Sequence, residues 1–257
     1  VFVAALIFFG HQLETDINDT GTEMTMEKES FPILQILTQG RTINPLYGYA
    51  APMEPDIVRE SMTPLAADRT MTVLLAGDST SRLTRLAYQI VDKESGEVYD
   101  KEDVSAVSKD QRQIEITFGF NFKTSTEYIL DLIGTSDEGR EIHYYTRIKY
   151  YQDDSNLGKK LDFVKKFHKS TFVKSKADDL EKYLEPSSKN RNSTLASVDI
   201  TSSSDLVTWG GLSPKIISDE YVTVKEYNME TACIQYNYFV RAKTSSTTEQ
   251  YHVKEMY

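Results

Sequence analysis

The strongest pattern in the chain is an alternation of apolar and polar residues along residues 114–122. The apolar members are Ile114, Ile116, Phe118, Phe120 and Phe122. Side chains two residues apart point to the same side of a β-strand, so this pattern predicts one strand with an apolar face toward a core. A register slip of one residue would turn all of these side chains to solvent, which favours a single register.

Shorter alternations of the same kind surround this strand. They predict four further strands at residues 71–75, 86–90, 128–132 and 142–148, with shorter candidates at 33–37 and 97–99. The polar stretches 92–96 and 136–140 each carry a late glycine, which is typical of hairpin loops. About seven strands in roughly 120 residues predict a mainly β chain whose first domain, residues 31–152, is an antiparallel β-sandwich. The proline-rich stretch 44–69 is predicted to be an irregular connection with a short helix at 55–62.

The period of the pattern changes near residue 152 from about 2 to about 3.6. Leu157, Leu161, Val164 and His168 recur at helical spacing, and a second helix is predicted around residues 177–184. Alternation then returns at 195–200, 221–227, 232–242 and 251–257. Residues 153–257 are therefore predicted to form a small α+β domain, with two helices followed by an antiparallel meander.

The start of the chain is apolar over residues 1–10 and polar over residues 11–30. Ten apolar residues cover about half of the roughly 20 that cross a bilayer as a helix. We expect them to be the end of a truncated membrane anchor, followed by a polar tether, in a single-pass protein of the cell membrane with its soluble part extracytoplasmic. A buried first strand is the alternative for residues 1–10. Because alternation continues through 251–257, we also expect that the second domain is truncated at its C-terminus.

Composition narrows the classes of function. The chain carries 29 basic and 39 acidic residues, a net charge of -10, which disfavours nucleic acid as a partner. Its single cysteine excludes an internal disulfide. Four histidines and one cysteine offer no zinc-type spacing, so neither a metal nor a cofactor is expected.

Positive charge is nevertheless concentrated in one place. Residues 155–189 hold nine lysines and five acidic residues. At about 100° per residue, Lys159, Lys166 and Lys169 fall opposite the apolar stripe of the first predicted helix, where they could contact a partner or simply be solvated. Trp209, the only tryptophan, lies in a turn-rich stretch, where its indole could either cap a core or offer a flat binding face.

One short stretch resembles a catalytic motif. Residues 73–81, VLLAGDSTS, run from an apolar strand into Gly-Asp-Ser. The stretch is similar to the nucleophile block of the GDSL, or SGNH, hydrolases, and this resemblance implies Ser79 as a nucleophile toward esters. The Asp-x-x-His pair of that family has no counterpart at any of the four histidines. A Gly-Asp-Ser turn between two strands is the alternative interpretation.

The layout of the whole chain resembles that of uncharacterised membrane-anchored extracytoplasmic bacterial proteins with a β-sandwich of the fibronectin type III or immunoglobulin-like kind. That resemblance implies surface display and supplies no active-site residues. We therefore expect a non-enzymatic, membrane-anchored surface interaction or structural module with a protein or glycan partner. The alternatives are a serine ester hydrolase that uses Ser79, and the N-terminal part of a larger sensor or enzyme.

Overall fold

The computed structural model describes residues 30–76, 82–107, 112–152, 155–176, 179–180, 183, 208–209, 212–243 and 247–257. The predicted anchor and nearly all of the predicted tether lie outside these residues, as do Ser79 and the strand predicted at 195–200. The second predicted helix also lies mostly outside them. Within the described residues, no helix combines the length and the apolar character needed to cross a membrane.

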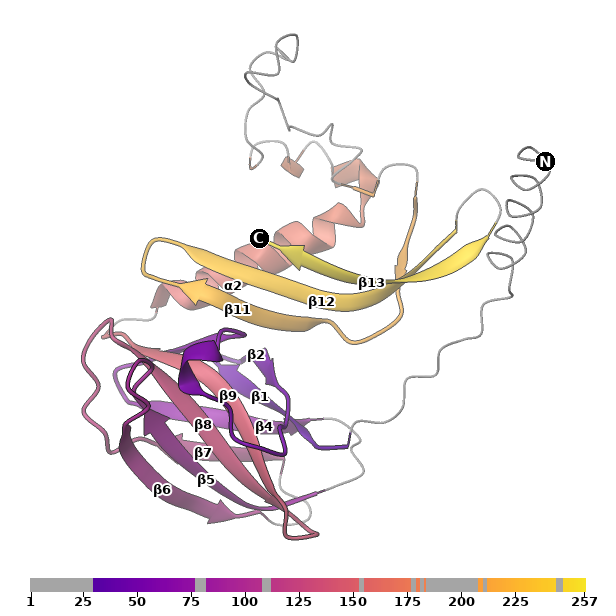
Figure 1. The fold of residues 1–257 in the computed structure, drawn as a ribbon. Coiled ribbons are helices and arrows are strands. Elements are labelled where there is room, and N and C mark those ends of the chain that lie inside the picture. The colour runs from indigo at the N-terminus through magenta and orange to yellow at the C-terminus, as the bar shows by residue number, and fades with distance from the viewer. Residues whose placement is uncertain are drawn as a thin grey trace, which may run out of the picture.

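The fold is mainly β, as predicted, and its strands form three sheets (Figure 1). The first sheet has the order β2-β1-β4-β7 and is antiparallel throughout. Its strands are β1 (Ile33–Thr38), β2 (Arg41–Leu46), β4 (Thr70–Ala76) and β7 (Gln113–Thr117).

The second sheet has the order β3-β9-β8-β5-β6. Its strands are β3 (Met62–Leu65), β5 (Leu83–Val91), β6 (Val98–Ala106), β8 (Glu127–Ser136) and β9 (Glu141–Tyr150). Two expectations are corrected here, because β3 lies inside the stretch predicted to be irregular and pairs with β9 in parallel. Pro64 lies within β3, and an edge strand tolerates a residue that has no N–H to donate. The short helix expected at 55–62 is a single 3-10 turn, η1 (Pro55–Ile57).

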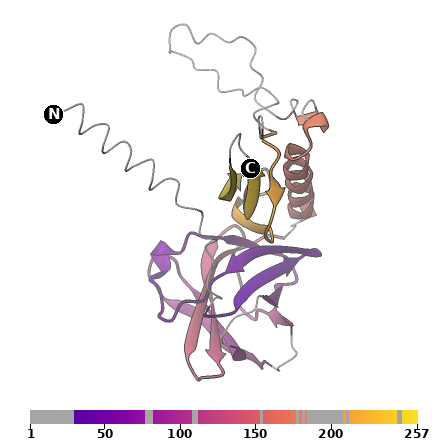
Figure 2. The same cartoon turned by 90° about the vertical axis from the view of Figure 1, so that its right-hand side faces the viewer.

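The third sheet and the main helix follow in the second half of the chain. The strands are β10 (Lys215–Ile216), β11 (Tyr221–Tyr227), β12 (Ala232–Lys243) and β13 (Thr248–Met256), with β12 between β13 on one side and β10 and β11 on the other. Helix α2 (Ser155–Thr171) is followed by the 3-10 turn η2 (Lys174–Lys176). Figures 1 and 2 show α2 beside the third sheet, and both lie at one end of the first two sheets.

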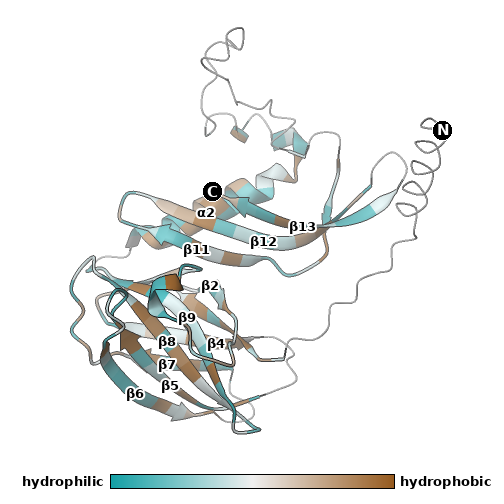
Figure 3. Ribbon diagram, viewed as in Figure 1, coloured by the Kyte–Doolittle hydropathy of each residue, from teal (hydrophilic) through white to brown (hydrophobic). Residues whose placement is uncertain are grey.

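Apolar residues of all three sheets and of α2 belong to one hydrophobic core (Figure 3). The alternation around β7 is confirmed, since Ile114, Ile116 and Phe118 are buried, although the strand itself ends at Thr117. Phe118 packs edge-on against Tyr88 with 5.0 Å between ring centroids. The Phe118 N–H also donates to the Arg69 carbonyl at 3.0 Å, so the residue continues both the burial pattern and the pairing of β7 just past the end of the strand.

The side chains predicted on the inner face of β8 and β9, such as Leu130, Leu132 and Tyr144, are buried as predicted, but the opposite face is buried too in the central parts of both strands. The outer face is covered by the proline-rich stretch, where Tyr49 bridges to His143 and Val58 packs with Ile129 and Tyr145. A segment without regular structure thus supplies a second, smaller core.

Three buried side chains join the first two sheets to the third. The Asn44 amide donates to the Met62 carbonyl at 2.9 Å, and its oxygen accepts from the Val224 N–H at 2.8 Å. Arg147 donates to Glu226 at 2.7 Å and to the Lys225 carbonyl, and the Tyr151 hydroxyl donates to the Tyr227 carbonyl at 2.8 Å. We call Asn44, Arg147 and Tyr151 the junction residues. They hold β11 next to β2 and β3.

Candidate functional site

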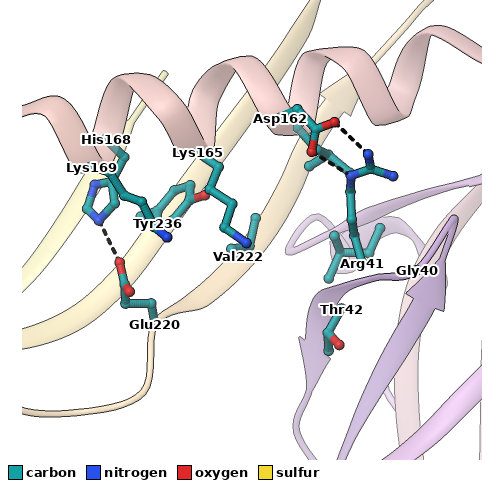
Figure 4. A pocket seen from close by; sticks show the side chains of 12 residues that line it. Gly40, Arg41, Thr42, Asp162, Lys165, His168, Lys169, Glu220, Val222 and Tyr236 are labelled. Atoms are coloured by element: carbon teal, nitrogen blue, oxygen red, sulfur yellow. Dashed lines mark hydrogen bonds and ion pairs between the residues drawn. The ribbon is translucent and has the colours of Figure 1, made fainter.

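A pocket of about 360 Å³ lies where α2, the third sheet and the turn between β1 and β2 meet. Figure 4 shows its lining side chains, which come from all three of these elements. The apolar part includes Ile43, Leu161 and Val222, and the polar part contains charges of both signs. The pocket therefore depends on the packing of the two halves of the chain against one another.

The wall nearest the first sheet is built by a two-residue hairpin turn. Gln39 and Gly40 have φ values of 48° and 73°, the left-handed conformation that a tight hairpin of this length requires. The turn brings Arg41 against α2, where its guanidinium donates to both carboxylate oxygens of Asp162 at 2.9 and 2.6 Å. This pairing lowers the pKa of Asp162 and raises the pKa of Arg41. Gly158 permits the close approach, since a Cβ there would lie 3.1 Å from Arg41 Nη1.

The opposite wall contains a buried histidine between two carboxylates. His168 is 1% exposed, with its Nε2 2.6 Å from Glu220 and its Nδ1 2.8 Å from Glu255. Each ring nitrogen of His168 is thus within hydrogen-bond distance of a carboxylate oxygen. Burial alone would raise the pKa of Glu255, but its hydrogen bonds with His168 and Tyr257 hold that pKa below its ordinary value. Glu255 is therefore a fixed negative charge beside the ring.

Tyr236 forms the floor next to this histidine. Its ring stacks on His168 with 4.3 Å between centroids and an interplanar angle of 24°. Burial, with the nearby charge of Glu220, raises the pKa of Tyr236 to about 12. The tyrosine is thus a neutral aromatic surface at physiological pH.

Two lysines of α2, Lys165 and Lys169, line the pocket between these walls. They are four residues apart and so lie on the same flank of the helix. Within the described part of the chain, neither lysine forms an ion pair. Asp162 is paired with Arg41, and this pair, with the nearby charge of Lys165, lowers the Asp162 pKa; Glu220 lies 2.6 Å from His168 Nε2. The pocket therefore contains two ammonium groups that form no ion pair with the described residues.

The structure separates the lysines that the sequence analysis grouped together. Lys159, Lys166 and Lys169 are all exposed, but of the three only Lys169 lines the pocket. Lys160 is held by the Asn228 carbonyl at 2.7 Å and lies over the Tyr227 ring. The pocket partner of Lys169 is thus Lys165, which helical-wheel reasoning alone did not select.

Trp209 lies elsewhere, at the end of α2. It is half-buried, and its ring centroid is 5.3 Å from that of Phe172, which packs on the hydrophobic core. The remaining candidate, Ser79, lies outside the described residues, so the structure neither brings a base to it nor separates it from one.

Most of the pocket could not be identified from the sequence. Arg41, Glu220 and Tyr236 come from segments far apart in the chain, and no local motif links them. His168 could have indicated the pocket from the sequence. It lies in an apolar helical stripe, where a buried titratable side chain needs polar partners from other segments.

Comparisons with known proteins place the chain in no established group. No family model matches the sequence, and no curated protein matches it. Among solved structures, CopC from Methylosinus trichosporium OB3b aligns with 36% of this chain and 88% of its own, at 11% identity and a TM-score of 0.26. A likeness of this size carries no argument about function.

Proposed function

We propose that this protein is a non-enzymatic surface interaction module attached to the cell membrane. In this proposal, residues 1–10 belong to the membrane segment and residues 11–30 are the tether. The first two sheets form a β-sandwich of the fibronectin type III or immunoglobulin-like kind, which acts as a spacer. Helix α2 and the third sheet then present the contact surface to a protein or glycan partner.

The observation that carries the proposal is the positive charge of α2 in an otherwise acidic chain. Lys159, Lys165, Lys166 and Lys169 are exposed on one helix, and the one acidic residue between them, Asp162, is paired with Arg41. Because the whole chain has a net charge of -10, a general attraction to anions is not expected. A localised cationic surface on such a protein supports recognition of an anionic group on the partner.

Charge reversal on the helix tests the contact surface. We expect the protein to bind heparin, used as a soluble anionic glycan, at low salt and to be released as salt increases. Changing Lys159, Lys166 and Lys169 to Glu should weaken this binding by at least about tenfold, since each lysine near an anionic surface contributes about 1 kcal/mol. Surface plasmon resonance at two salt concentrations measures both effects.

The matched control changes three exposed lysines away from α2, namely Lys101, Lys123 and Lys243, to Glu. This variant has the same net charge as the first, so any difference between them reports position. Equal loss of binding in both variants, or no heparin binding at low salt, would contradict α2 as the contact surface.

Attachment is tested separately. We expect the protein expressed from its natural gene to sediment with membranes and to remain there in high salt and alkaline carbonate, because burial of an apolar segment is insensitive to both treatments. Deleting residues 1–29 should release it to the soluble fraction with its fold intact by circular dichroism. Recovery of the intact protein in the soluble fraction would refute the membrane part of the proposal.

A further inference from the structure

We infer that the pocket between α2, the third sheet and the β1–β2 turn binds a phosphate group through Lys165 and Lys169. The inference rests on the proposed interaction function and names the chemical group that this surface recognises. It concerns a different lysine pair from Lys159 and Lys166, which lie outside the pocket.

The charges of the pocket favour a compact anion. Each carboxylate that lines the pocket already has a hydrogen-bond partner, the Arg41 guanidinium for Asp162 and the His168 ring for Glu220. The ammonium groups of Lys165 and Lys169 are therefore the charges left for a ligand. Two lysines from adjacent turns of one helix flank match a group that bears about two negative charges, such as a phosphate monoester.

The side chains around Lys165 and Lys169 strengthen the attraction of these lysines to an anion. In Figure 4 the lysines lie close to Val222 and Tyr236, and Ile43 adds to the apolar lining. Charges interact more strongly beside such a low-dielectric surface than in open water. Thr42 also lines the pocket, on the side of the β1–β2 turn.

The frame of the pocket limits how the ligand lies. The Arg41–Asp162 pair closes one end, and the Glu220–His168–Glu255 group closes the other with negative charge. A phosphate is repelled by Glu220 and is held where the ammonium groups of Lys165 and Lys169 both reach it. The volume of about 360 Å³ admits a phosphate with a small attached group, such as one sugar ring or a lipid headgroup.

The test uses the whole chain and three probes, which are inorganic phosphate, glucose 6-phosphate, and phosphatidylcholine vesicles with or without phosphatidic acid. For the soluble probes, NMR at low salt should show saturable shifts of the backbone amides of Gly40, Thr42 and Val222. For the vesicles, phosphatidic acid should increase co-sedimentation above the level that residues 1–10 give with phosphatidylcholine alone. The soluble and vesicle arms distinguish a free phosphate ester from a lipid headgroup as the source of the group.

Two variants of the same helix locate the site. Changing Lys165 and Lys169 to Gln should weaken phosphate binding by roughly tenfold or more, whereas changing Lys159 and Lys166 to Gln removes the same charge and should change it by less than about twofold. Binding that depends on the first pair supports the inference, whether the bound form is soluble or lipid. Equal effects of the two pairs, or no binding to any of the three probes, would overturn it. Heparin binding that persists without phosphate binding would overturn this inference and leave the proposed function standing.

Discussion

Replacing Phe118 with Ala should lower the free energy of unfolding by about 3–5 kcal/mol. Phe118 is 2% exposed and packs against the rings of Tyr88 and Phe122, at centroid distances of 5.0 and 5.8 Å. Alanine would leave a cavity among aromatic side chains that surrounding residues cannot refill without moving the strands. Urea denaturation, followed by tryptophan fluorescence and circular dichroism, measures the change.

The matched control is Phe163→Ala. Phe163 lies on α2 and is 45% exposed, so the same substitution should cost less than about 1 kcal/mol there. A Phe118→Ala variant no less stable than this control would show that Phe118 does not lie in the core.

Replacing Arg147 with Met should lower the free energy of unfolding by about 2–5 kcal/mol. The guanidinium is buried and donates to the carbonyls of Ser61 and Lys225 as well as to Glu226. Methionine has a similar length but no side-chain donor, so the Lys225 carbonyl loses the Arg147 bond, while the Ser61 carbonyl keeps only the backbone N–H of residue 147. Thermal and urea unfolding of the variant measure the loss.

An exposed arginine provides the comparison. Arg85 pairs with Asp103 at 3.4 Å and its side chain is 65% exposed, so Arg85→Met should cost less than about 1 kcal/mol. Glu226 is itself 63% exposed, and Glu226→Gln should also be mild. If Arg147→Met is as mild as either of these, the carbonyl contacts of Arg147 do not stabilise the junction.

The sequence predicted those elements whose pattern depends on one buried face. The predicted bounds 221–227 coincide with β11, and the helical stripe of Leu157, Leu161 and Val164 is buried in α2. In α2 one face meets the core and the other meets solvent, so the period of the sequence follows the geometry directly, whereas in β11 the neighbouring Thr223 and Val224 are both buried.

The sequence did not predict which residues cover the outer faces of β8 and β9. Ile129 and Tyr145 face outward from the main core, and their burial depends on Tyr49 and Val58 from a stretch with no periodic signal. The pocket was missed for the same reason. Lys165 lines the pocket and Lys166 does not. This difference depends on segments far apart in the sequence that pack against α2, and the local pattern of the helix does not contain it.

The junction residues also define how the molecule carries mechanical load. A force applied between β1, in the first sheet, and β13, in the third, has to cross the boundary where Asn44, Arg147 and Tyr151 bind the backbone of β11. These bonds are short and buried, and they act together with the shared apolar core. Tension between the two ends of the fold would therefore pass through these bonds, across the same boundary that the pocket spans.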